Sequence, residues 1–86
     1  MKNYFIGIDV SKTTLDVALH SLEGHLNSNH VVIENNAKGF KAMLTWLKEK
    51  KINNQDVLIC MEHTGIYADK VVDFLETKNI AYSLQS

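Results

Sequence analysis

The chain has 86 residues, about 45% of them apolar and 22% charged, and its formal charge is −1 at pH 7. This composition is typical of one small globular domain with a modest core. No apolar run is long enough to span a bilayer, and the N-terminal apolar stretch is interrupted by Asp9 and lacks a small-residue cleavage site. A single cysteine, Cys60, excludes an internal disulfide. We therefore expect a cytoplasmic protein without a signal peptide or a membrane segment.

The basic residues limit how this segment could recognise nucleic acid. All nine are lysines and none is arginine. Bidentate guanidinium contacts to phosphate or guanine therefore cannot come from these residues. Base-specific recognition would have to come from elsewhere in a longer chain or from a partner.

Three strands are predicted in the first part of the chain. Residues 4–10 are nearly all apolar, which is typical of a central strand covered on both faces. Residues 14–20 alternate between an apolar and a more polar face. The more polar face carries Asp16, Ala18 and His20. The connection, residues 11–13, is short enough for an antiparallel hairpin. Gly24 lies in the next turn, and residues 30–34 form the third strand.

A first helix is predicted over residues 37–51. Asn35 and Asn36 precede it and offer an N-cap. Its apolar positions follow helical spacing, and lysines cluster in its last turn, where cations suit the helix dipole. We therefore expect an amphipathic helix packed on the sheet.

A strand, a helix and another strand complete the chain. Residues 57–61 are continuously apolar and end at Glu62. Residues 66–78 show a helical stripe of apolar side chains, and Asn79 is a plausible stop. Residues 80–84 begin a fifth strand.

The element order, β-β-β-α-β-α-β, predicts how the sheet is connected. The first three strands form a meander, and the last two arrive through helical crossovers, which require parallel neighbours and a right-handed connection. The continuously apolar strands, 4–10 and 57–61, are the natural centre of the sheet and should be adjacent and parallel. The prediction is an α/β fold with a mixed five-stranded sheet, which is the topology of the RNase H-like fold.

Two acids stand at corresponding strand ends. Asp9 ends the first strand and Glu62 ends the fourth. In adjacent parallel strands, about 4.8 Å apart, their carboxylates would lie side by side at the sheet edge where α/β proteins bind ligands. Close carboxylates repel unless a cation joins them, and such oxygen ligands suit Mg²⁺ or Mn²⁺. The alternative is that each acid is only a strand-end residue near solvent.

Two blocks of sequence resemble a known family. Phe5-Ile6-Gly7-Ile8-Asp9-Val10-Ser11-Lys12, followed by Leu15-Asp16-Val17-Ala18, is similar to the opening of the DEDD transposases of bacterial insertion sequences, in the insertion sequence 110 family. Met61-Glu62-His63-Thr64-Gly65-Ile66-Tyr67 resembles their second block. Both blocks have the correct order and spacing, and the resemblance covers essentially the whole chain.

The resemblance implies a RuvC-like domain in which four acids bind Mg²⁺ or Mn²⁺ and act in DNA strand cleavage and transfer during transposition. Asp9 would be the first acid and Glu62 the second, whereas Asp16 is not one of the four. An aspartate pair on a later helix, and a C-terminal domain with a serine used in strand exchange, would lie beyond Ser86. Residues 1–86 would then be the N-terminal part of the domain, inactive in isolation. The implied partners are DNA, a structured guide RNA and further copies of the full-length protein in a homo-oligomer.

Other residues have both a functional and a structural interpretation. Lys12 could contact a phosphate or be a solvated turn lysine. Thr64 and Gly65, at a helix start, could direct backbone N–H groups at a phosphate or form an ordinary N-cap. Gly7 could allow a helix or a nucleic-acid backbone to come close, or serve tight packing. His63 could be a third metal ligand or point away from Glu62.

Two other functions fit parts of the chain. An actin-like ATPase or sugar kinase opens with a similar strand, an Asp and a phosphate-binding hairpin, but the glycine expected in that hairpin is absent, since Ser11 and Lys12 stand there. A non-catalytic module for dimerisation or RNA binding is the third possibility.

Overall fold

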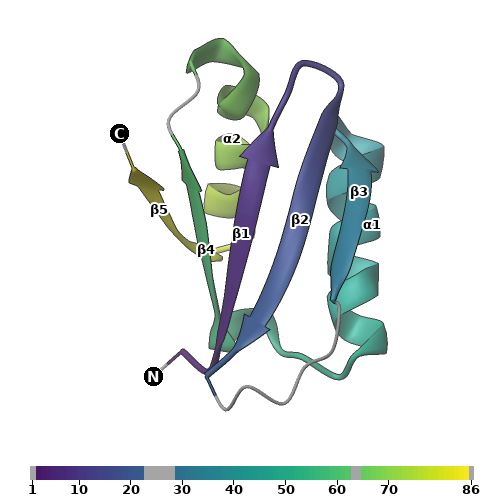
Figure 1. Ribbon diagram of the computed structural model, residues 1–86, viewed down its shortest axis with the longest axis vertical. Coiled ribbons are helices and arrows are strands. Elements are labelled where there is room, and N and C mark those ends of the chain that lie inside the picture. The colour runs from purple at the N-terminus through teal and green to yellow at the C-terminus, as the bar shows by residue number, and fades with distance from the viewer. Residues whose placement is uncertain (1, 23–28, 63–64, 86) are drawn as a thin grey trace.

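The computed structural model describes residues 2–22, 29–62 and 65–85. The strands are β1 (Tyr4–Val10), β2 (Thr14–Ser21), β3 (His30–Glu34), β4 (Val57–Glu62) and β5 (Ala81–Gln85). The helices are α1 (Ala37–Glu49) and α2 (Asp69–Thr77), with 3₁₀ turns η1 (Asn54–Asp56) and η2 (Gly65–Ala68). The strands form one mixed sheet in the order β3-β2-β1-β4-β5 (Figure 1). The predicted α/β architecture is therefore confirmed; Gly24 lies outside the described residues.

Strand β1 lies at the centre of this sheet. It pairs antiparallel with β2, where Ile8 is opposite Val17, and parallel with β4, where Ile8 is beside Met61. β2 pairs antiparallel with β3, and β4 pairs parallel with β5. The predicted adjacency of the two continuously apolar strands is confirmed.

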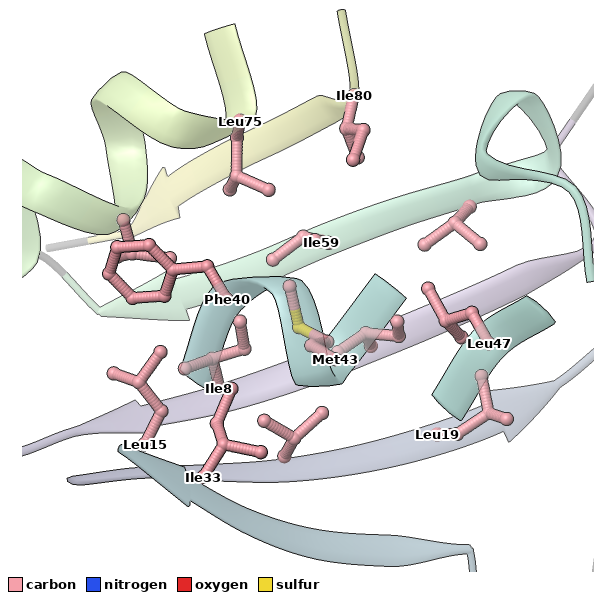
Figure 2. Close-up of a cluster of buried hydrophobic side chains, with 14 of the residues drawn as sticks. Ile8, Leu15, Leu19, Ile33, Phe40, Met43, Leu47, Ile59, Leu75 and Ile80 are labelled. Carbon is pink, nitrogen blue, oxygen red and sulfur yellow. The ribbon is translucent and has the colours of Figure 1, made fainter. Parts of the chain in front are cut away.

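Both helices pack on the same face of the sheet. In Figure 1 they lie behind it, and Figure 2 shows Phe40, Met43 and Leu47 of α1 and Leu75 of α2 clustered with apolar side chains of the strands. The sheet contributes every second residue to this core: Ile6, Ile8, Leu15, Val17, Leu19, Ile33, Val57, Ile59 and Met61. No helix in the described part of the chain has the length and apolar character to cross a membrane.

The prediction that β1 is covered on both faces is wrong for the residues that the structure describes. Ile6 and Ile8 are 0% and 5% exposed, but Phe5 and Gly7 are half-buried and Asp9 is exposed. The connectivity explains this difference. The crossovers from β3 to β4 and from β4 to β5 run in the same direction along the sheet. Right-handed crossovers in one direction place both helices on one face.

The helix ends also differ from the predictions. α1 stops at Glu49, two residues early, and Lys51 then takes a left-handed conformation (φ 61°) while Ile52 N–H bonds to Leu47 O at 3.0 Å. The second predicted helix begins as a four-residue 3₁₀ turn, and only α2, from Asp69, is α-helical. The helix stops just before Asn79, as predicted. Asn79 has a left-handed backbone conformation (φ 57°), which asparagine tolerates.

Two glycines have opposite surroundings. A Cβ on Gly7 would have no atom of the described residues within 4 Å, so neither tight packing nor a close helix explains this glycine. A Cβ on Gly39, in the first turn of α1, would lie 1.8 Å from the carbonyl oxygen of Glu34. The close approach of helix and strand is therefore at Gly39.

Replacing each glycine by alanine should separate these two situations. We expect Gly39→Ala to lower the free energy of unfolding by about 1–3 kcal/mol, because α1 must move away from β3. Gly7→Ala should be neutral or stabilising by up to about 1 kcal/mol, because glycine inside a strand costs conformational entropy. Urea unfolding of the two variants measures this. A larger loss for Gly7→Ala than for Gly39→Ala would contradict the packing described here.

Candidate functional site

The two predicted acids come together on the uncovered face of the sheet. Ile8 and Met61 are buried beneath the helices, so the next residues along each strand, Asp9 and Glu62, point to the opposite face. The parallel ladder pairs Ile8 with Met61 as its last step. Asp9 and Glu62 therefore lie one step beyond it as neighbours, and both are exposed.

These acids border a shallow groove of about 610 Å³ in the same face. Its floor is low because three small residues, Ala18, Gly7 and Cys60, stand in a row across β2, β1 and β4. Cys60 is half-buried in this floor. The full lining is Gly7, Ile8, Asp9, Asp16, Ala18, His30, Cys60, Met61, Glu62 and Gln85. The groove thus has a floor of small side chains and acids along one edge.

Asp16 is a neighbour of the pair that the sequence interpretation left out. It is directly opposite Asp9 in the β1–β2 ladder, and both line the groove. His30 Nε2 contacts the Oδ1 atom of Asp16. Glu62, Asp9 and Asp16 therefore form a row of carboxylates across β4, β1 and β2. The sequence contained a signal for this pairing. Cross-strand partners share a face of the sheet, so buried Ile8 pairs with an apolar residue, Val17, and Asp9 then pairs with Asp16.

This row of like charges has an energetic cost. Like charges directly opposite on neighbouring strands destabilise a sheet.

In the described residues, no three side chains of His, Cys, Asp or Glu converge closely enough to hold a metal ion. The chemistry of the oxygen donors fits Mg²⁺ or Mn²⁺. Asp9 and Glu62 thus fit as part of a ligand set.

Two of the three residues predicted to contact nucleic acid, Lys12 and Gly65, are described by the structure, and both lie at the end of the sheet that carries the acids. Lys12 is exposed in the β1–β2 hairpin, and Gly65 is exposed at the start of η2 with φ 69°. The predicted helix start at this point is wrong, because the α-helix begins at Asp69 after the short 3₁₀ turn. Contacts from Lys12 and Gly65 stay predictions. Thr64 and His63 lie outside the described residues.

The one side chain of the described residues with a clearly shifted pKa, Tyr82, lies on the other face of the sheet. Tyr82 on β5 donates a hydrogen bond from its hydroxyl to Glu76 Oε1 at 2.7 Å. This bond to a carboxylate raises the pKa of Tyr82 above its ordinary value of 10. Its ladder partner is the buried Ile59, so Tyr82 lies on the helix side and takes no part in the groove.

The fold and the acids together define an RNase H-like domain with carboxylates at the ends of its two central strands. A family model for the DEDD transposases of insertion sequence 110 type, described as "Transposase", matches residues 6–84. The chain therefore belongs to this family of transposases. The family resemblance and the RNase H-like fold inferred from the sequence are both confirmed. A comparison with curated proteins found no match.

Removing one acid should relieve the repulsion in the row. Without divalent cations and at low salt, we expect Asp9→Asn to raise the free energy of unfolding by about 0.5 kcal/mol, because Asp9 faces Asp16 across the ladder. Added salt should shrink this gain, since screening weakens interactions between exposed charges. Urea unfolding in a chelating buffer measures both effects. A loss of stability in Asp9→Asn would mean that the carboxylate has a stabilising partner.

Proposed function

We propose that this domain supplies the first two acids of a site for metal-dependent DNA strand cleavage and transfer. The observation that carries the proposal is the parallel register of β1 and β4, which makes Asp9 and Glu62 neighbours on an accessible face. Membership of a transposase family supplies the substrate class, because transposases act on DNA. In this proposal Asp9 and Glu62 would hold Mg²⁺ or Mn²⁺ through their carboxylate oxygens.

The charge of the site supports a role for a cation. Glu62, Asp9 and Asp16 would together repel a phosphodiester that entered the groove. When bound, a divalent cation activates water and neutralises charge that develops on the reacting phosphate. Asp9 and Glu62 would orient that cation from the two central strands. The low floor at Gly7, Ala18 and Cys60 leaves space for a nucleic-acid backbone above them.

Two acids do not make a complete site of this class. The remaining ligands would come from the aspartate pair that the family resemblance implies beyond Ser86. Residues 1–86 would then be the N-terminal part of the catalytic domain and inactive alone. The same proposal includes contacts to phosphate from Lys12, Thr64 and Gly65. It also includes a structured guide RNA as partner, a homo-oligomeric full-length protein and a cytoplasmic location.

The hairpin after β1 favours this function over a phosphate-binding ATPase or kinase loop. The hydroxyl groups of Ser11 and Thr14 bond to each other across the turn, with Ser11 Oγ and Thr14 Oγ1 2.8 Å apart, and Thr14 N–H donates to Ser11 Oγ at 3.3 Å. A loop that cradles phosphate would direct such donors outward and would use glycine to let the ligand approach. The transposase family match supports the same choice.

A titration with Mn²⁺ tests the proposal. We expect paramagnetic broadening of backbone amide NMR signals to centre on Asp9 and Glu62. The broadening should disappear in Asp9→Asn and in Glu62→Gln, because each variant removes one of two adjacent ligands. Glu49→Gln, at the end of α1, should behave like the unmodified chain. Broadening spread over the surface, or unchanged by the first two substitutions, would refute a cation site and favour the non-catalytic module.

A further inference from the structure

We infer that Asn35, which lies between β3 and α1, is a positioning residue that holds Asp9 and Glu62 at a fixed spacing. Its side-chain amide joins the hairpin after Asp9 to the 3₁₀ turn after Glu62. The inference rests on the proposed metal site, and it adds a residue that touches neither the cation nor the DNA.

The contacts of Asn35 span the end of the sheet. Asn35 Nδ2 donates to Ser11 O at 2.9 Å and to Tyr67 O at 2.9 Å, although these partners are 24 and 32 residues away in the chain. The backbone N–H of Asn35 donates to Thr13 O, also at 2.9 Å. In Figure 1 the β1–β2 hairpin and η2 lie at the same end of the sheet. One residue thus connects three segments at the end that carries the acids.

This connection is placed where the strand ladder stops. The β1–β4 ladder ends at Ile8 and Met61. Beyond it, Asp9 is held to Asp16 of β2, and Glu62 is held to Gln85 of β5. The two acids therefore belong to different halves of the sheet at this edge. Asn35 bridges these halves just past the acids, two residues after Asp9 and five after Glu62.

The chemistry of the amide explains why this residue is an asparagine. Both hydrogen bonds use the NH₂ group, whereas Oδ1 is buried and meets no donor among the described residues. The donor half of the amide is therefore the half that the fold uses. An aspartate would set a carboxylate oxygen against two carbonyl oxygens, and alanine would leave both carbonyls without this donor.

The adjacent Asn36 offers a matched control. Its Oδ1 accepts from Gly39 N–H at 2.9 Å as the N-cap of α1, and its Nδ2 donates to Glu34 Oε2 at 2.8 Å. Both bonds stay within the junction of β3 and α1. Asn36→Ala should therefore lower stability without changing the spacing of the acids.

The experiment measures amide hydrogen exchange and Mn²⁺ affinity in the 86-residue chain and in the variants Asn35→Asp, Asn35→Ala and Asn36→Ala. We expect the first two variants to exchange faster in residues 11–14 and 65–68 together. They should also bind Mn²⁺ at Asp9 and Glu62 about tenfold more weakly, a typical effect of removing a residue that orients metal ligands. Asn36→Ala should keep the affinity of the unmodified chain, although its urea midpoint falls. A general loss of stability would weaken binding in all three variants alike.

Either of two binding results would overturn the inference, and so would the absence of the Asn35 bridge in the unmodified chain. If the unmodified chain binds Mn²⁺ at the pair and Asn35→Asp and Asn35→Ala bind it equally well, Asn35 does not position the acids and the metal proposal stands without it. If the unmodified chain binds no Mn²⁺ there, the metal proposal fails and the inference fails with it. Should the Asn35 variants not fold, the unmodified chain still decides. Its Asn35 NH₂ protons must be protected from solvent and show NOEs to Ser11 and Tyr67, and their absence would refute the bridge.

Discussion

The parallel pairing of β1 with β4 is the constraint on which the rest of this domain depends. It requires a crossover, which α1 provides by leading from β3 past two strands to β4. Because the crossover to β5 runs in the same direction, both helices cover one face and leave the other open in the described residues. The same register that buries Ile8 beside Met61 turns Asp9 and Glu62 to the open face. Core and candidate site are thus two consequences of one strand pairing.

The residues on the open face lower the stability of the sheet. Three carboxylates stand in adjacent strands, a glycine occupies the centre of β1 without a packing reason, and small side chains form the groove floor. Each of these features weakens a sheet relative to apolar or β-branched residues at the same positions. Such losses are typical of functional sites, where selection retains chemistry at the expense of stability.

Much of the fold could be predicted from the sequence because it follows from local pattern and general connection rules. The strands, the adjacency of the two continuously apolar strands and the placing of Asp9 and Glu62 at neighbouring strand ends required only hydrophobic periodicity and the preference for parallel crossovers. The open face was missed because continuous apolar character was equated with double coverage. The place of β5 beside β4, which makes both crossovers run in one direction, was not predicted. The position of Asp16 opposite Asp9 was not predicted, because strand ends alone were considered and only the register of the hairpin sets these two residues opposite each other.

Other features depend on tertiary contacts that no local pattern encodes. The bridge from Asn35 to Ser11 and Tyr67 joins segments that are 24 and 32 residues apart in the chain. The sequence indicated Asn35 only as part of an N-cap, and its neighbour Asn36 takes that role. The geometry alone does not identify the class of protein. The match to the family model does, because it shows that the chain belongs to a family of transposases.

The most direct test of the paired-acid site is a crystal structure of the chain grown with Mn²⁺, using anomalous scattering to locate the ion. We expect an anomalous peak at coordination distance, about 2 Å, from carboxylate oxygens of both Asp9 and Glu62. An ion bound elsewhere, or an Asp9 and a Glu62 that turn apart with no ion between them, would contradict a shared cation site.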